Sequence, residues 1–319
     1  MPERIPQPLG GVYALIKFLV KHKLLPSPAK MLVTPHDERL KHHNPRWMVK
    51  PGPAADIEDV IVAGRDGPIP ARIYTRPGTR PAAPAILFIH GGAFMDLGLD
   101  HCDNVQRGLA RRTGYVVVGL SYRLAPEHPF PAALHDCADV LQWMHDTRPG
   151  GLDPQRIAVG GESAGGNLTV ALCLYARDQH GPAISHQSVY YPFTDTSLSS
   201  ADWDSGLMPG ADRRAGELMV RLYAGHDPGN PLVNLLGADL RGLPPATVVT
   251  CGHDVLHTDG VRLVQALRAA GVETRHTHHD DMPHGFLMLS RLTTRADESM
   301  DEMAREVTKF LGPAEAVPA

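Results

Sequence analysis

Short apolar runs alternate with amphipathic stretches along this chain. Residues 56–62 and 70–74 each have the pattern of a strand, and the Arg-Asp-Gly sequence at 65–67 contains the Asp-Gly pair typical of a tight hairpin turn. Residues 85–89 are continuously apolar (Ala-Ile-Leu-Phe-Ile), which indicates a central strand buried on both faces. The main body of the chain is therefore predicted to begin with a hairpin followed by a buried strand.

Helical and strand patterns alternate over most of the remaining sequence. We predict helices at residues 103–113, 132–145, 164–179, 259–270 and 296–311, and strands at residues 115–120, 156–160, 187–191, 246–251 and 273–278. Strands that alternate with helices favour a mostly parallel sheet with helices packed on both faces. The predicted fold class is therefore α/β.

Residues 194–243 interrupt this alternation. The segment is rich in serine, glycine and proline, contains the large aromatic side chains of Trp203 and Tyr223, and has one helical stretch near residues 215–223. An insertion of this length between two strands is usually a lid or a binding loop. We expect it to lie over the functional site.

The N-terminal region predicts an amphipathic helix docked on the body. Residues 12–25 are apolar apart from His22 and three lysines, and Lys17 and Lys21 lie four positions apart on one helical stripe. A secretory signal is the alternative, but the apolar core is interrupted and no small-residue cleavage site follows it. No run reaches the roughly 18 apolar residues of a membrane helix. We therefore expect a cytoplasmic protein without stable membrane anchoring.

Charge and cysteine content exclude two further classes. The net charge is −4 and the isoelectric point is about 6.5, so the chain has no general basic field that would attract nucleic acid. The four cysteines lie far apart in the sequence, which argues against a disulfide scaffold. We expect no nucleic-acid partner.

The sequence Gly-Glu-Ser-Ala-Gly at 161–165 indicates a nucleophilic serine. Ser163 lies between the predicted strand at 156–160 and the predicted helix that begins at Ala164. A serine in a sharp strand-to-helix turn needs small neighbours so that the surrounding backbone can fit. The alternative is a glycine-rich turn with an incidental serine. We predict that Ser163 is the nucleophile of an acyl-transfer reaction.

The sequence His90-Gly91-Gly92 follows the buried strand at 85–89. Two glycines after a strand allow the backbone to turn with its N–H groups outward. We predict that the N–H groups of Gly91 and Gly92, together with that of Ala164, bind the oxyanion of a tetrahedral intermediate. His90 itself is expected to hold the loop rather than to transfer a proton.

A serine hydroxyl needs a base that accepts its proton. Among the 18 histidines, His284 lies in a loop after the last predicted strand, and Asp254 follows the strand predicted at 246–251. This gives the order serine, aspartate, histidine that a nucleophile on such a turn requires. We predict His284 as general base and Asp254 as the acid that orients it. The rivals of Asp254 are Asp259, which resembles a helix-starting residue, and Asp280 and Asp281, which share a loop with His284.

Together, five motifs resemble the hormone-sensitive-lipase-like family of bacterial carboxylesterases. They are His90-Gly91-Gly92, Tyr122-Arg123-Leu124-Ala125-Pro126-Glu127, the Gly-Glu-Ser-Ala-Gly-Gly-Asn sequence at 161–167, Asp254-Val255-Leu256 and His284-Gly285-Phe286. The resemblance covers about residues 55–311. It implies an α/β-hydrolase fold with an eight-stranded sheet and a helical cap, built from residues 1–54 and an insertion at about 194–243, on a catalytic domain of residues 55–319. It also implies frequent homodimers, no cofactor, and hydrolysis of short to medium acyl-chain esters through an acyl-enzyme.

Three residues depart from the pattern of that family. Ala93 replaces the usual third glycine of the loop at residues 90–93, which we call the oxyanion loop. Glu162 stands where aspartate is commoner, and Asp281 replaces a glycine. None of these removes a catalytic group. The Ala93 methyl is expected to narrow the alcohol side of the site, and Glu162 keeps the charge of aspartate with a longer reach.

The substrate pocket is expected to draw its apolar lining from Phe94, Leu97 and Met208. Several alternatives to an esterase stay open. The same triad would serve an amidase or a lactonase, and a ligand-binding receptor on this fold would have a broken triad. The crowded residues His276, His278, His279, Asp280, Asp281 and His284 would suit a metal-dependent hydrolase, since zinc takes such ligands. We expect no metal, because the triad already uses His284.

Overall fold

The computed structural model describes residues 2–22, 52 and 55–314. Its centre is an eight-stranded sheet in the order β1-β2-β4-β3-β5-β6-β7-β8. β2 pairs antiparallel with both β1 and β4, and all the other neighbours are parallel. The strands are β1 (Asp56–Gly64), β2 (Gly67–Thr75), β3 (Ala83–Ile89), β4 (Val116–Leu120), β5 (Leu152–Glu162), β6 (His186–Tyr190), β7 (Ala246–His253) and β8 (Thr274–Pro283). The predicted mostly parallel α/β sheet is confirmed.

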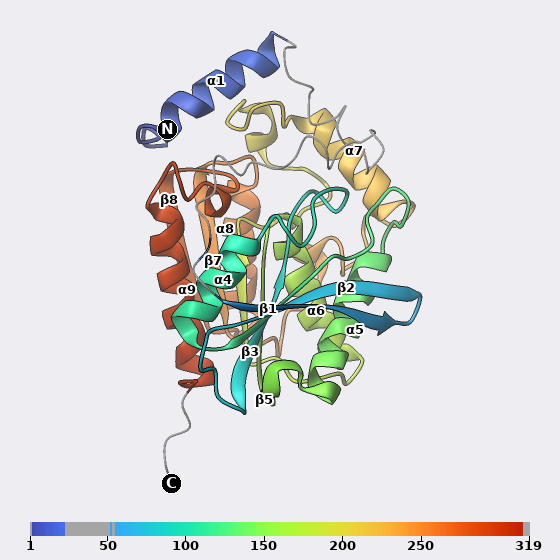
Figure 1. The fold of residues 1–319 in the computed structure, drawn as a ribbon. Coiled ribbons are helices and arrows are strands. Elements are labelled where there is room, and N and C mark those ends of the chain that lie inside the picture. Colours follow the sequence, from blue (N-terminus) through green and yellow to red (C-terminus); the bar gives the residue numbers. More distant parts are fainter. Residues whose placement is uncertain (1, 23–51, 53–54, 315–319) are drawn as a thin grey trace.

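Helices cover both faces of this sheet (Figure 1). On one face, α4 (Asp103–Thr113) and α9 (Arg295–Leu311) pack in one apolar cluster with strand residues such as Phe88. On the other face, α5 (Ala132–Thr147), α6 (Ala164–Asp178) and α8 (His257–Ala269) pack in a second cluster with strand residues such as Leu87. Successive side chains of β3 enter opposite clusters, because side chains alternate along a strand. The continuous apolar run at 85–89 is therefore explained by burial on both faces.

The predicted hairpin is present, with Gly64 paired to Gly67 across a two-residue loop. Among the other strands, β5 and β8 extend furthest beyond their predicted bounds. β5 begins at Leu152 rather than at Arg156, and β8 continues to Pro283 rather than ending at His278. β8 is the last strand in the sheet, where a half-exposed edge tolerates polar residues that obscure the apolar pattern. Its extension brings the strand end directly to His284.

The segment between β6 and β7 contains α7 (Arg213–Ala224) and short 3₁₀ turns, among them Ala201–Asp204. The N-terminal helix α1 (Leu9–Lys21) lies beside this segment, and Tyr13 donates its hydroxyl to the carbonyl of Leu207 at 2.6 Å. Figure 1 shows α1 and α7 together at the end of the molecule opposite the last turn of the C-terminal helix α9 (Arg295–Leu311). The predicted helix at 12–25 begins three residues earlier in the structure, and residues 23–25 lie outside the described residues.

The carbonyl of Glu3 lies 2.6 Å from His253 Nε2, and the Glu3 N–H donates to Asp280 at 2.8 Å. These contacts place Glu3 against residues of β7 and β8, and the helical cap stays a prediction. The domain boundary at 54/55 stays a prediction, since residues 53–54 are outside the described part. Among the described helices, none combines the length and apolar character needed to cross a bilayer.

Candidate active site

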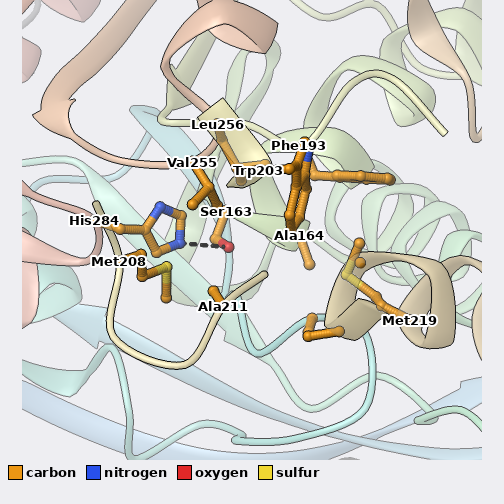
Figure 2. Close-up of a pocket in the computed structure, with 13 residues that line it drawn as sticks. Ser163, Ala164, Phe193, Trp203, Met208, Ala211, Met219, Val255, Leu256 and His284 are labelled. Carbon is orange, nitrogen blue, oxygen red and sulfur yellow. Dashed lines mark hydrogen bonds between the residues drawn. The ribbon is translucent and has the colours of Figure 1, made fainter. Parts of the chain in front are cut away.

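The structure brings Ser163, His284 and Asp254 into one hydrogen-bonded chain. Ser163 Oγ lies 2.9 Å from His284 Nε2, and His284 Nδ1 lies 2.8 Å from Asp254 Oδ2 (Figure 2 shows the first of these contacts). The residues follow the ends of β5, β8 and β7, so three carboxyl ends of parallel strands supply the group. A nucleophile, a base and an acid that orients the base are therefore in reach of one another.

Ser163 occupies a strained turn between β5 and α6. Its backbone has φ 56° and ψ −119°, a conformation that residues with a side chain rarely adopt. Gly165 makes the turn possible, because a β-carbon there would lie 2.2 Å from the carbonyl oxygen of Ile89. The turn projects Ser163 Oγ towards His284 and places the N-terminus of α6 directly behind it. That end of the helix favours developing negative charge.

The environment of His284 favours its protonated form. Burial of the imidazole lowers the pKa, but the charge of Asp254 and the hydrogen bond to it raise the pKa, with a further contribution from the charge of Glu162. The net effect is a pKa of His284 above its ordinary value. Asp254 is fully buried, and its second oxygen accepts the Leu256 N–H at 2.8 Å. The acid is thereby fixed on the Nδ1 side of the ring.

The three rivals of Asp254 have other partners. Asp259 lies in the first turn of α8 and accepts N–H groups from Thr194 and Asp195, both at 3.2 Å. Asp280 bonds to the Glu3 N–H, and Asp281 pairs with Arg295 at 3.4 Å. Burial raises the pKa of Asp259 to about 7, although the two N–H donors oppose this effect. Asp259 therefore supports the start of the insertion rather than His284.

The N–H groups predicted to bind the oxyanion differ in whether they already have a hydrogen-bond acceptor. The Gly91 N–H donates to Glu162 Oε1 at 2.7 Å, which differs from the predicted role and satisfies a buried carboxylate. Gly92 and Ala93 follow with positive φ angles of 100° and 54°, and none of the described residues accepts a hydrogen bond from their N–H groups. Ala164 begins α6, so its N–H has no acceptor within the helix. Gly92, Ala93 and Ala164 thus offer the N–H groups that could hold an oxyanion.

An apolar pocket of about 120 Å³ opens at Ser163 and His284. Its other lining residues come from the oxyanion loop, the start of α6, the insertion and the segment after β7 (Figure 2). They are Ala93, Ala164, Phe193, Trp203, Met208, Ala211, Ala215, Gly216, Met219, Val255 and Leu256. The insertion therefore supplies much of the wall.

Of the three predicted pocket residues, only Met208 is in this lining. Phe94 is fully buried and stacks on Tyr223 with ring centroids 3.7 Å apart, so it joins the insertion to the core instead. Leu97 is half-buried on the same loop and does not border the pocket. Trp203 and Met219 were not predicted as lining residues, because their position depends on how the insertion folds. The aromatic character of Trp203 was the available signal.

The histidine-rich strand β8 does not form the alternative metal site. His276 and His278 share a face, as their spacing predicts. Thr250 Oγ1 lies 2.8 Å from His276 Nε2 and 2.9 Å from His278 Nδ1. Within the part of the chain that the structure describes, a group of three or more potential metal ligands occurs only at His101, Cys102 and Glu162. The geometry therefore gives the metal-dependent hydrolase no support at β8.

Known proteins that are similar to this chain include several ester hydrolases. Residues 86–288 match a protein family described as alpha/beta hydrolase fold. The esterase LipI of Mycobacterium tuberculosis is 36% identical over 256 residues, which cover 77% of this chain and 80% of that protein. The ethyl acetate hydrolase of Pseudomonas putida is 32% identical and covers 76% of this chain and 80% of its own. The solved structure of an ester hydrolase from the metagenome of Lake Arreo has a TM-score of 0.87 at 27% identity, covering 97% of this chain and 99% of its own.

Proposed function

The chain belongs to the hormone-sensitive-lipase-like family of α/β hydrolases and is a carboxylic ester hydrolase, and on this premise we propose that Ser163, His284 and Asp254 perform its reaction. The observation that carries the proposal is the continuous path of hydrogen bonds from Ser163 Oγ through His284 to Asp254. The proposed substrates are esters with short to medium acyl chains. No cofactor takes part in the proposed mechanism.

In this mechanism Ser163 Oγ attacks the ester carbonyl carbon while His284 Nε2 accepts the hydroxyl proton. Asp254 keeps the other ring nitrogen protonated and stabilises the imidazolium that forms. The N–H groups of Gly92, Ala93 and Ala164 bind the oxyanion, in place of the set with Gly91 that the sequence predicted. His284 then protonates the departing alcohol, and water hydrolyses the acyl-enzyme by the same route.

A substrate panel with a metal chelator tests the proposed function. p-Nitrophenyl esters from acetate to palmitate are expected to be hydrolysed fastest at short or medium chains, with equal rates in the presence and absence of EDTA. A dialkyl p-nitrophenyl phosphate should abolish activity and leave its phosphoryl group on the peptide that contains Ser163, as read by mass spectrometry. Loss of activity with EDTA, or a label on another residue, would contradict the proposal.

The size of the apolar pocket predicts a limit on the acyl chain. About 120 Å³ is less than the volume of pockets that enclose drug-sized ligands. Met219 projects from α7 into this space and is nearly buried. Met219→Ala is expected to raise kcat/KM for octanoate relative to butyrate by about tenfold, because one or two methylene groups are worth that much in an apolar pocket.

Met144→Ala is the matched control, since Met144 is buried in α5 and does not border the pocket. It should lose stability in the same way without any change in chain preference. A parallel series of alkyl acetates separates acyl from alcohol binding. If Met219→Ala altered the alkyl acetate profile and left the acyl profile unchanged, the pocket would hold the alcohol group instead.

A cytoplasmic location and a homodimer are further parts of the proposal. The four cysteines are buried and unpaired, as is usual in a reducing compartment. Light scattering of the purified protein measures the oligomeric state, and cell fractionation measures the location.

A further inference from the structure

One buried carboxylate links the nucleophile turn to the oxyanion loop. Glu162 is the last residue of β5, directly precedes Ser163 and is 3% exposed. Its Oε1 accepts the Gly91 N–H at 2.7 Å. The approach is so close that a β-carbon at Gly91 would lie 2.3 Å from the same oxygen and would displace the carboxylate. The orientation of the Gly91 N–H is therefore determined by Glu162.

The carbonyl groups of this loop are held from the opposite side. Tyr122 Oη lies 2.9 Å from the His90 carbonyl and 3.0 Å from the Gly91 carbonyl, and His90 Nδ1 also lies 2.7 Å from the latter. In a planar trans peptide the N–H points opposite to the C=O. The Gly91 N–H thus points away from Tyr122 towards Glu162, and the Gly92 N–H also points away from Tyr122. Glu162 and Tyr122 together fix both peptide planes around Gly91.

Glu162 also interacts with His284 through its charge, since it directly precedes the serine whose Oγ lies 2.9 Å from His284 Nε2. Burial raises the pKa of Glu162, while the charge of His284 and the Gly91 N–H oppose that effect. Among the described residues, the other titratable groups around the carboxylate are His101, whose Nε2 lies 3.7 Å from Oε1, and Cys102, Tyr122 and Tyr191. A carboxylate in this position favours the imidazolium over the neutral ring, as Asp254 does more directly.

We propose that Glu162 is a positioning residue for ester hydrolysis, which holds the oxyanion loop through Gly91 and stabilises the imidazolium of His284 by its charge. The proposal rests on the triad proposed above. Glu162 acts through Gly91 and His284 and needs no contact with the substrate.

Two substitutions separate the two effects. Glu162→Gln keeps an oxygen that can accept the Gly91 N–H but removes the charge. It should move the acidic limb of the kcat/KM profile to lower pH, because an imidazolium without this neighbouring charge loses its proton more easily. Glu162→Asp keeps the charge but is one methylene shorter. It should leave the acidic limb in place and lower kcat on the order of tenfold, with KM nearly unchanged, which is less than the loss of a whole oxyanion donor.

Glu273→Gln is the control, because Glu273 is exposed and precedes β8 at the end of that strand remote from His284. Thermal unfolding shows whether each variant is folded, and the affinity for phenylboronic acid reports the oxyanion loop without turnover. That acid forms a tetrahedral adduct with a reactive serine, so Glu162→Asp should bind it more weakly by the same factor as kcat falls.

Wild-type kcat, boronate affinity and pH profile in both folded Glu162 variants would overturn the inference. The same holds if activity fell only in proportion to the folded fraction. An active Ser163→Ala variant would instead overturn the proposed function itself. An inactive Ser163→Ala beside Glu162 variants of wild-type behaviour would leave the triad standing and reject only the role of Glu162.

Discussion

Ser163→Ala is expected to lower kcat for p-nitrophenyl butyrate by about 10⁵-fold or more, because removal of the nucleophile disables the whole catalytic unit. The substitution removes one oxygen atom from a site where His284 and Asp254 remain in place. His284 would then have no hydroxyl to deprotonate at 2.9 Å. Initial rates at saturating substrate measure the loss. His284→Ala should have a similar effect, and the double variant should be little worse than either single one, since the groups act as a unit.

Ser185→Ala is a suitable control for that experiment. Ser185 precedes β6 at the end of the sheet opposite the site, and its N–H bonds to the Ile157 carbonyl, which the substitution does not change. It should retain wild-type kcat. Ser163 would be rejected as the nucleophile if the Ser163→Ala protein kept more than about one part in a thousand of the wild-type activity. This residual activity would have to follow the amount of the variant through purification, so that it does not come from a contaminant.

The strands that were predicted accurately are those whose burial produces a simple pattern of apolar and polar residues in the sequence. β3 is buried on both faces, so every residue of it is apolar, and its position followed directly from the sequence. β8 has one exposed edge, and residues 278–281 within it are two histidines and two aspartates, which do not have to be apolar there. The end of that strand could not be predicted, although it is the feature that brings His284 to the site.

In the candidate site, too, some contacts could be predicted from the sequence and others could not. The meeting of Ser163, Asp254 and His284 could be predicted, because their order and local context reflect which strand ends meet at one edge of a parallel sheet. The partner of the Gly91 N–H could not, because it depends on the rotation of a single peptide plane. Phe94 was misplaced for a related reason. Its stacking on Tyr223 joins two segments 129 positions apart, and no local pattern reports such a contact.

Asp254→Asn is expected to lower kcat by about 10⁴-fold with little change in the fold, because it alters the tautomer of His284. The Leu256 N–H donates to Asp254 Oδ1, and an asparagine would keep its oxygen on this donor. Its NH₂ group would then face His284 Nδ1 and donate to it. The proton of the neutral ring would move to Nε2. This nitrogen lies 2.9 Å from Ser163 Oγ and normally accepts the proton of that hydroxyl. The base would be present in the correct place and in the wrong protonation state.

Asp259→Asn is the matched comparison, since both aspartates follow β7 and both are fully buried. It should keep kcat within about threefold of the wild type, because Asp259 bonds to the backbone of Thr194 and Asp195 and not to His284. The effect of Asp259→Asn should instead appear in the pH dependence of the stability of the folded protein. Burial raises the pKa of Asp259 to about 7, so the folded wild type binds an extra proton between about pH 4 and 7 and loses stability as the pH rises through that range.

A neutral asparagine at position 259 removes this pH dependence of stability. The unfolding temperature of Asp259→Asn minus that of the wild type should therefore increase from pH 5 to pH 8. The two substitutions thus separate two buried carboxyl groups that the sequence alone left as rivals. If Asp259→Asn abolished turnover and Asp254→Asn did not, the acid of the triad would have to be reassigned. The hydrogen bond of 2.8 Å between Asp254 and His284 predicts the opposite result.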